Sequence, residues 1–532
     1  MQACSARPEP RRRGLLLAWW VALLLLLLLL LALAGCSSLA PPAERPPSLA
    51  VQGGPDTQLG RLAAVQAAAH PGLSGLMAFE DPHDALAARL MLAQAAERSI
   101  DAQYFIWNGD TVGLLLWHAL WDAAERGVRV RVLLDDANTS GLDPLLAALD
   151  AHPMLELRLY NPFVQRGSRT LGYLSDFRRL NRRMHNKSFT VDSTASVVGG
   201  RNIADAYFGA DESLGFADLD VLAIGPVVQQ VVDEFDLYWN SASAYPAAPF
   251  VGAPPADPAS ALQARFAAAR QGDRAQAYLR AVERSDFATQ LRQQQLTLDW
   301  TTAQLLYDQP GKTLDGDDRA DLQMLPLLMH RMGVPQRQLD IVSPYFVPGA
   351  DGVALLTDLA RQGVQVRVLT NSLASSDESV VHAGYMKRRQ DLLRVGVQLY
   401  ELKPSAAESS LRVRGRFGPA KVSGLHAKTY GVDGQRSFVG SFNFDQRSAN
   451  LNTEMGLVID SPHAAGRLDE IFDEIVPEIA YEVKLAPDGQ NLQWRERSED
   501  GRLTVYDVDP QTSVWKRFGV NFLAGLPIEW LL

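Results

Sequence analysis

The sequence predicts an α/β protein built from two duplicated α/β domains that pack about a pseudo-twofold axis. Three observations support this fold class: strands and helices alternate after residue 60, the alternation recurs at a nearly constant offset, and one polar motif occurs once in each half. At ~100–200 residues per domain, a length of 532 residues allows two to four domains. A content of 47% hydrophobic and 21% charged residues is typical of a folded globular chain.

Residues 1–35 predict a lipoprotein-type signal peptide. An uncharged run over 14–35 follows three arginines and ends at Leu33-Ala34-Gly35-Cys36, which resembles a bacterial lipobox with Cys36 as the lipidated residue. The alternative is a retained transmembrane helix, because ~20 apolar residues cross a bilayer core and signal peptides usually have shorter apolar cores. Both interpretations tether the protein to a bacterial membrane on its periplasmic side. Ser37 resembles the pattern of lipoproteins that reach the outer membrane.

Charge and composition divide the rest of the chain. The leader has four Arg and one Glu, so the remaining residues carry a net charge of −13 rather than −10. This acidity argues against nucleic acid as a partner. We expect a tether over 36–60, a first domain over 61–248, a connecting segment over 249–320 and a second domain over 321–532. The Pro- and Ala-rich start of the connecting segment is equally compatible with an edge of the first domain.

The first βαβ unit is predicted from a strand over 99–107, a helix over 111–126 that ends near Gly127, and a strand over 128–134 with period-two alternation. The second unit is predicted from strands over 338–346 and 363–369 around a helix over 351–362. Asp101 and Asp340 are 239 residues apart, and Tyr160 and Tyr400 are 240 apart. Landmarks at one offset indicate an internal duplication.

Each half carries the pattern H-x-K-x4-D-x6-G-[GS]-x-N. Its members are His185, Lys187, Asp192 and Asn202 in the first half, and His426, Lys428, Asp433 and Asn443 in the second. Residues i and i+2 of a strand face the same side, so each His and its Lys should point into one site. By the same parity Asp192 and Asp433 point away, and we expect them to fix a loop or turn.

Two imidazoles, two ammonium groups and two carboxamides suit a phosphoryl group. Cationic donors stabilise negative charge on its oxygens, while one His attacks and the other protonates the leaving oxygen. A metal site is the rival interpretation, because His is a common ligand. The paired lysines disfavour it, since an ammonium has no lone pair and repels a cation. We therefore expect no metal and no cofactor.

These motifs resemble the two HKD motifs of the phospholipase D superfamily, and the resemblance covers nearly all of the chain after the tether. The segments SIDAQYFIW, RGVRVRVLLDD and LYELKP are similar to the short, C-type branch of bacterial cardiolipin synthases. The resemblance implies a covalent phosphohistidine, with His185 as nucleophile and His426 as acid and base. The symmetry of the sequence leaves the order of the two histidines open.

The resemblance also implies a carboxylate downstream of each motif that orients a His across the interface. Glu454 in the second half and Asp218 in the first occupy these places, and surface salt bridges are the alternative role. Residues 371–390 are one candidate membrane-facing helix, although an ordinary amphipathic surface helix explains them better. The basic run of Arg178, Arg179, Arg182 and Arg183 before His185 is a candidate contact for an anionic head group, and a solvated charged face explains it at least as well.

The implied function is a phosphatidyl transferase that makes cardiolipin from phosphatidylglycerol and a second phospholipid at a membrane surface. The alternative is a hydrolytic phospholipase D or phosphodiesterase with the same site. A non-enzymatic lipoprotein scaffold is disfavoured because both motifs are intact. The phospholipid substrates are the expected partners, and the sequence does not identify any accessory protein.

Overall fold

The computed structural model describes residues 19–26, 39, 47–52, 54, 56–209, 215–293, 295–315, 320–404, 424–498, 500–526, 529 and 532. Most of the predicted leader, including Cys36, lies outside these residues. Among the described helices, none combines the length and the apolar character that crossing a bilayer requires.

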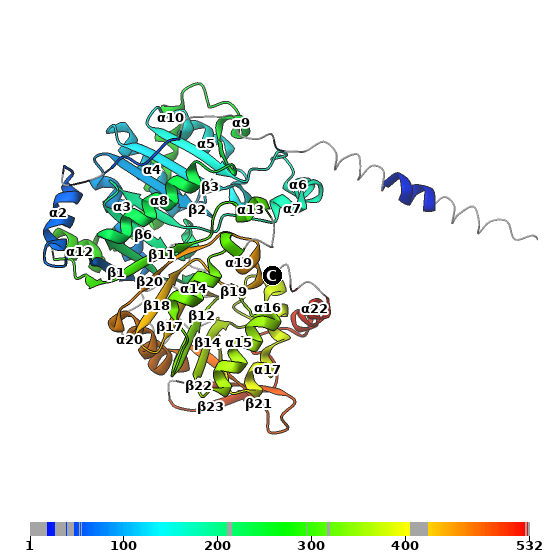
Figure 1. The fold of residues 1–532 in the computed structure, drawn as a ribbon. Helices are drawn as coiled ribbons and strands as arrows, with labels where there is room; N and C mark the ends of the chain where they lie inside the picture. Colours follow the sequence, from blue (N-terminus) through cyan, green and yellow to red (C-terminus); the bar gives the residue numbers. More distant parts are fainter. Residues whose placement is uncertain are drawn as a thin grey trace, which may run out of the picture.

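Two mixed sheets form the framework of the molecule (Figure 1). The first has the strand order β10 (Asp299–Thr301), β1 (Ser74–Phe79), β8 (Asp220–Ile224), β6 (Ala195–Gly199), β5 (Ser188–Val191), β2 (Ser99–Tyr104), β3 (Arg129–Asp135), β4 (Leu155–Tyr160) and β9 (Ala244–Pro246). The second has the order β11 (Ala303–Tyr307), β20 (Met455–Ile459), β18 (Arg436–Gly440), β17 (Thr429–Val432), β12 (Gln338–Val342), β14 (Gln365–Asn371), β15 (Gln398–Leu402), β21 (Ala480–Leu485), β22 (Leu492–Arg497) and β23 (Leu503–Tyr506).

The centres of the two sheets repeat each other, which confirms the predicted duplicated α/β fold. In the first half β2, β3 and β4 are parallel, and in the second half β12, β14 and β15 are parallel. The motif strands β5 and β17 pair antiparallel with β2 and β12. Asp101 bonds Arg131 on the neighbouring strand at 2.6 and 2.8 Å, and Asp340 bonds Arg367 at the same two distances.

Helices cover both sheets. Those of the first half are α2 (Gln58–Ala67), α3 (Pro82–Ala95), α4 (Thr111–Glu125), α5 (Asp143–Asp150), α6 (Arg169–Ser175), α7 (Phe177–Leu180), α8 (Pro226–Trp239), α9 (Ala248–Val251), α10 (Pro258–Gln271), α11 (Asp273–Glu283) and α12 (Asp286–Arg292). The remaining helices are α13 (Lys312–Asp315), α14 (Leu325–Met332), α15 (Gly349–Arg361), α16 (Ser379–Met386), α17 (Arg389–Arg394), α19 (Gln446–Asn450), α20 (Pro462–Glu470), α21 (Val476–Ile479) and α22 (Val514–Ala524), with a π-helix, η4, at Ile471–Ile475.

The two predicted crossover helices end as the sequence indicates. Helix α4 begins after Asp110, whose side chain accepts a hydrogen bond from Gly113 N, and ends before Gly127 at φ 88°. Helix α15 ends before Gly363 at φ 89°. Both glycines occupy the left-handed region that a side chain disfavours.

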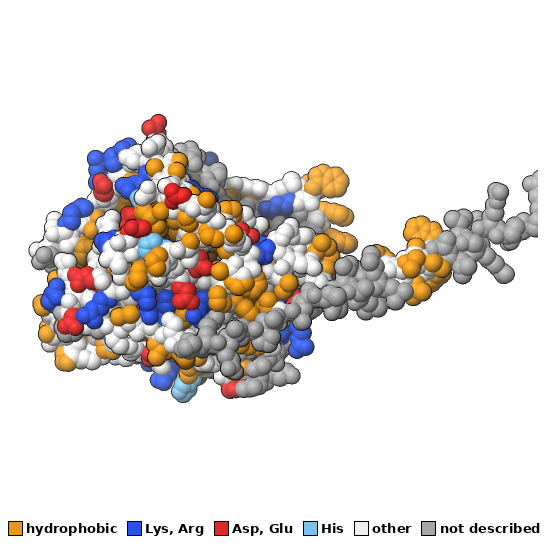
Figure 2. All heavy atoms as spheres, turned by 90° about the horizontal axis from the view of Figure 1, so that it is seen from above, with side chains coloured by type: hydrophobic (Ala, Val, Ile, Leu, Met, Phe, Trp, Pro, Cys, Tyr) orange, Lys and Arg blue, Asp and Glu red, His pale blue; other side chains and the backbone are white. Residues whose placement is uncertain are grey.

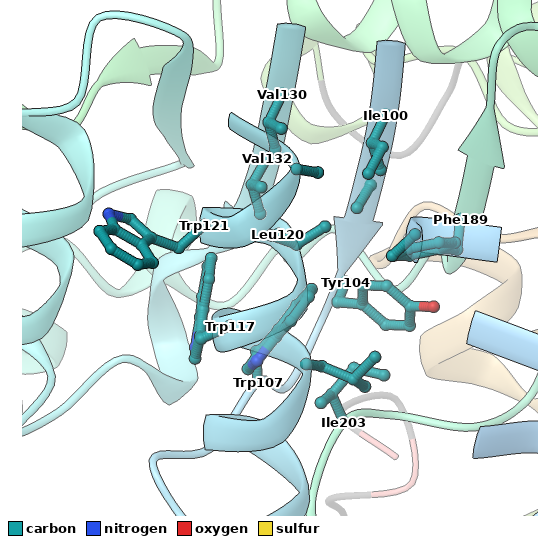
Figure 3. Packing of buried hydrophobic residues seen from close by; sticks show 14 of the residues in the cluster. Ile100, Tyr104, Trp107, Trp117, Leu120, Trp121, Val130, Val132, Phe189 and Ile203 are labelled. Carbon is teal, nitrogen blue, oxygen red and sulfur yellow. The ribbon is translucent and has the colours of Figure 1, made fainter. Parts of the chain in front are cut away.

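The core of the first half lies between α4 and the face of β2 and β3 (Figure 3). The rings of Trp107 and Trp117 stack at 4.2 Å, and Tyr104 meets Trp107 edge-on at 5.4 Å. Because large apolar side chains each contribute about 1.5–3 kcal/mol when fully buried, this cluster holds α4 firmly on the sheet.

The segment predicted as a connector has two parts. Helices α10, α11 and α12 pack on α3, α4 and α5 of the first half, and β10 extends the first sheet. Strand β11 then pairs with β20 in the second sheet. The chain therefore passes from one half to the other at Thr302, between these two strands.

Candidate active site

The two motifs lie at the junction of the halves, just before their strands begin. Strand β5 starts at Ser188 and β17 at Thr429, so each motif His and Lys lies in the segment that leads into the strand rather than within it. All four of these side chains are buried.

Each motif is fixed by a backbone contact with the opposite half. The His185 amide donates to the Thr453 carbonyl at 2.8 Å, and the His426 amide donates to the Ala217 carbonyl at 2.8 Å. A short parallel pairing of β16 (Gly424–Leu425) with β7 (Phe216–Ala217) supports the second contact. The next residues along the chain, Glu454 and Asp218, are therefore brought to the histidines.

Both histidines contact a carboxylate of the other half. His185 Nδ1 lies 2.8 Å from Glu454 Oε2, and His426 Nδ1 lies 2.6 Å from Asp218 Oδ2. A carboxylate at Nδ1 selects the tautomer with its proton on that nitrogen, so Nε2 is left free on each ring. Glu454 and Asp218 are buried, and neither forms a surface salt bridge.

The motif lysines and asparagines surround the histidines. Each lysine Nζ donates to the carbonyl of its own motif His, and Lys428 Nζ also lies 3.0 Å from His426 Nδ1. Among the described residues, Nδ2 of Asn202 and Oδ1 of Asn443 are buried without a hydrogen-bond partner. Since the two ends of a carboxamide can exchange by a flip, both asparagines can offer an N–H to a bound oxygen.

Burial and positive charge shift the pKa values of these cations downward. Burial, assisted by Lys187 and Lys428, lowers the pKa of His185 well below its usual value. Burial and Lys428 lower the pKa of His426 to about 4. Burial and repulsion from Lys428 lower the pKa of Lys187 to about 7, and burial lowers the pKa of Lys428 to about 8. An anion at this position would relieve the repulsion, so the site favours a negatively charged ligand.

The two carboxylates that hold the histidines, Asp218 and Glu454, differ in pKa. Burial opposes ionisation of Asp218, but His426 and Lys428 outweigh it and lower its pKa to about 2. Burial raises the pKa of Glu454 to about 7. Ser441 and Ser448 donate hydrogen bonds to Glu454. The two halves thus hold their histidines with unequal partners.

The one difference between the motifs, Gly200 against Ser441, follows from this inequality. The Ser441 hydroxyl donates to Glu454. A Cβ added to Gly200 would lie 2.2 Å from Oδ1 of Asp218. The shorter aspartate has to approach the backbone to reach its histidine, and only glycine leaves room for it.

Asp192 and Asp433 lie outside the site and bind the backbone. Both have positive φ, at 51° and 56°. Asp192 accepts from Arg98 N at 2.8 Å, and Asp433 accepts from Arg337 N at 2.8 Å, in the turns that precede β2 and β12. These contacts agree with a structural role.

The predicted connecting segment contributes a support that sequence reasoning missed. Asp308 Oδ2 accepts from Glu454 N at 2.8 Å and lies 3.0 Å from Lys312 Nζ. Lys312 also donates to the Ser448 carbonyl at 2.9 Å. The scarcity of lysine, with eight in the chain, was the available signal for Lys312.

The structure narrows the two candidate lipid contacts, and of the basic run Arg178 stays exposed. Arg183 of the basic run is buried and bonds Asp135 at 2.8 Å, so it is neither a solvated charge nor a free lipid ligand. In the segment 371–390, helix α16 is covered by α22, and Tyr385 is buried.

Comparisons with known proteins agree with this site. A sequence model of the family described as "Cardiolipin synthase, PLD-like domain" matches residues 90–239 and 328–476. Cardiolipin synthase C of Escherichia coli (strain K12) is 48% identical over 467 residues, which cover 87% of this chain and 97% of that protein. An uncharacterized protein of Helicobacter pylori (strain ATCC 700392 / 26695) is 30% identical over 489 residues, covering 88% and 92%.

The fold agrees as well. The crystal structure of phosphatidylserine synthase from Haemophilus influenzae Rd KW20 matches with a TM-score of 0.52 and 12% identity, covering 80% of this chain and 92% of that one. The chain belongs to the phospholipase D superfamily, and within it to the cardiolipin synthase family with a PLD-like domain.

Proposed function

We propose that the protein is a phospholipase D-type phosphatidyl transferase that makes cardiolipin from phosphatidylglycerol and a second phospholipid. The observation that carries this proposal is the pair of buried histidines, each held at Nδ1 by a carboxylate of the other half and surrounded by two lysines. The similarity to cardiolipin synthase C supports the choice of substrate.

The proposed reaction has two displacements at phosphorus. Nε2 of His185 attacks the phosphodiester, the bond to the departing alcohol breaks, and His426 gives that oxygen a proton. The hydroxyl of the acceptor phospholipid then gives a proton to His426 and attacks the phosphohistidine. Its new bond to phosphorus releases His185, and the reaction ends with cardiolipin and the free alcohol.

The remaining site residues act on the phosphate oxygens. Lys187 and Lys428 neutralise the charge that develops, and Asn202 and Asn443 add neutral donors. A bound phosphodiester anion also raises the pKa of His426 from its low value, because it offsets the repulsion from Lys428. Proton transfer to the leaving oxygen is thereby coupled to substrate binding.

The proposal also places the protein against a lipid bilayer. Helix α22 exposes Trp515, Phe518 and Phe522 on one face, while Val520 packs inward beside α16. A helix of this kind, with aromatic rings on its outer face, suits the boundary between lipid and water.

The first half also exposes apolar side chains, on the same side of the molecule as α22. Leu171, Leu174 and Phe177 of α6 and α7 are exposed. In Figure 1 these helices and α22 lie at one edge of the body, and Figure 2, which keeps left and right, has hydrophobic side chains at that edge. Lipidation of Cys36 after cleavage of the leader, and a periplasmic location, complete the proposed attachment. Lipidation is tested by labelling a Cys36→Ala variant with a fatty-acid probe, because retained lipid would contradict the assignment.

Product analysis tests the function. Purified protein is incubated with radiolabelled phosphatidylglycerol, alone and with phosphatidylethanolamine as the second phospholipid. Cardiolipin is the expected product, and phosphatidic acid alone would identify a hydrolytic phospholipase D instead. The His185→Ala variant should form neither product, and full turnover by it would contradict the mechanism.

A further inference from the structure

A large apolar cavity lies behind the second motif. Its volume is about 650 Å³, and aliphatic side chains from both halves line most of it. Its polar rim includes Glu80, which pairs with Arg467 of α20 at 3.1 Å, and the well exposed His463. Its inner wall includes Ala427, which lies between the motif His426 and Lys428, and Asp218.

The internal duplication makes it possible to ask what occupies the same place in the first half. Two triads, each built on a buried aspartate–arginine pair, set the alignment: Asp101, Arg131 and Asp236 in one half, and Asp340, Arg367 and Asp473 in the other. The arginine of each triad lies 4.8 Å from the centre of an aromatic ring that immediately precedes the last aspartate, Phe235 or Phe472. The alignment therefore holds on the sheets and on the helices behind them.

In the first half, side chains fill the space that corresponds to the cavity. Glu234, two residues before the last aspartate of the triad, accepts hydrogen bonds from Asn186 and Gln103. All three side chains are fully buried, and burial raises the pKa of Glu234 to about 8. This polar cluster fills the space between α8, β2 and the first motif.

The second half has none of these three polar residues at the corresponding positions. The positions that correspond to Gln103, Asn186 and Glu234 are Val342, Ala427 and Ile471, and each of these lines the cavity. The helix behind them carries the π-helix Ile471–Ile475, an irregularity that often marks functional sites. The hollow is thus a specific difference between two otherwise matching halves.

An aliphatic chain is the ligand that these walls fit. Protein interiors are densely packed, and water requires two to four polar partners that an aliphatic lining does not offer. The described lining residues include no Phe, Tyr or Trp that would stack on a flat ring. The volume lies within the ~300–1,000 Å³ of ordinary ligand pockets.

We propose that this cavity binds a single fatty-acyl chain, with the chain in contact with the back of the His426–Asp218 pair. The source of the chain is a substrate phospholipid or a second lipid that stays bound during turnover. Only the first source rests on the proposed function. The binding site itself is inferred from the cavity in the second half and from the polar cluster that fills the corresponding space in the first half.

Photolabelling tests occupancy without turnover. Full-length protein carrying His185→Ala is incubated with phosphatidylglycerol, or with palmitate, that bears a diazirine within the chain. We expect label in peptides that contain 425–429 and 462–479. Ile471→Trp, which fills the cavity, should reduce this label about tenfold. Glu478→Trp places the same ring on the exposed side of α21 and should leave the label unchanged.

The outcomes separate the alternatives. Equal labelling of the Ile471→Trp protein, or label only elsewhere, overturns the site. If Ile471→Trp fails to fold, as judged by thermal melting, Ala464→Phe fills the same cavity from α20 and is subject to the same criterion.

Kinetics with active protein identify the source of the chain. A substrate chain predicts that Ile471→Trp lowers kcat/KM for dioleoyl-phosphatidylglycerol about tenfold and leaves that for the dihexanoyl form unchanged. If palmitate labels the cavity but Ile471→Trp affects both phosphatidylglycerols equally, the chain belongs to a second lipid. Wild-type protein that labels normally but forms no phosphodiester product contradicts the proposed function and leaves the acyl site standing.

Discussion

At the two histidines, chemistry depends on which ring nitrogen remains free. Carboxylates hold Nδ1 of both rings, and the partners come from residues 269 and 208 positions away in the chain. Glu454 is itself fixed by Ser441, Ser448 and the backbone contact from Asp308. We therefore regard it as a positioning residue for His185.

Replacement of Glu454 by Gln should lower kcat by about a hundredfold or more, with a much smaller change in KM, because the ring loses its preferred tautomer while the phosphate ligands remain. Glu454→Asp should restore part of the rate. Steady-state kinetics measure both values. The Asp433→Asn variant is the control outside the site, and a purely structural role for Glu454 would instead reduce the amount of folded enzyme and leave kcat per folded molecule intact.

The charge near His185 sets the acid limb of the pH profile. Burial, the two lysines and Arg447 all lower the pKa of His185, so the neutral, nucleophilic ring persists below its ordinary value of 6.5. Removing a cation raises that pKa and moves the acid limb of kcat/KM to higher pH. We expect this upward shift for Arg447→Gln and not for Arg447→Lys. An acid limb that Arg447→Gln leaves unchanged would contradict the assignment of His185 as nucleophile.

At the scale of elements, helix α22 covers α16 with its inner face and exposes aromatic side chains on its outer face. It packs on α16 through Val520, and its outer face carries Trp515 and Phe518. Beyond α22, the Leu532 carbonyl accepts a hydrogen bond from Arg447 N at 2.8 Å. Because Leu532 follows α22 and contacts a residue near His185, we expect membrane contact through α22 to hold the lipid close to the site.

The double change Trp515→Ser and Phe518→Ser should weaken binding to phosphatidylglycerol vesicles about tenfold, since two exposed aromatic rings would no longer enter the interface. Sedimentation of a chain without residues 1–38 measures this binding. Leu503→Ser and Val505→Ser on β23 remove exposed apolar side chains at a distant edge and serve as the control. Equal loss in both pairs would argue against a specific surface.

At the scale of the whole molecule, the two duplicated halves form a complete site only together. Each histidine and its carboxylate belong to different halves, and β7 of the first half pairs with β16 of the second. Neither half therefore contains a complete site.

Separate expression of residues 39–302 and 303–532 should give no turnover above background, whereas co-expression should restore cardiolipin formation if the halves associate. Thin-layer chromatography of the labelled lipids measures the product. Activity in one isolated half would contradict a site shared across the interface. Size-exclusion chromatography of the co-expressed halves provides the control for association.

Local patterns were sufficient to predict the elements. Period-two alternation located β3 and β14, glycines marked the ends of α4 and α15, and the repeated motif indicated the histidines and lysines. The limits of each element were less exact: the predicted strand over 99–107 ends at Tyr104, and the motif pairs precede their strands. Hydrogen bonding to neighbouring strands decides such limits, and it depends on partners that are distant in sequence.

The sequence by itself determined the duplicated α/β fold, the two HKD motifs and the family, because repetition and motif spacing are properties of the chain alone. Only the tertiary structure decided that Asp308 and Lys312 support Glu454, that Arg183 is buried, and that the second half is hollow where the first is filled. These features depend on contacts across the interface and on the volume left between elements. Neither quantity is set by local sequence, since both arise only when residues far apart in the chain pack together.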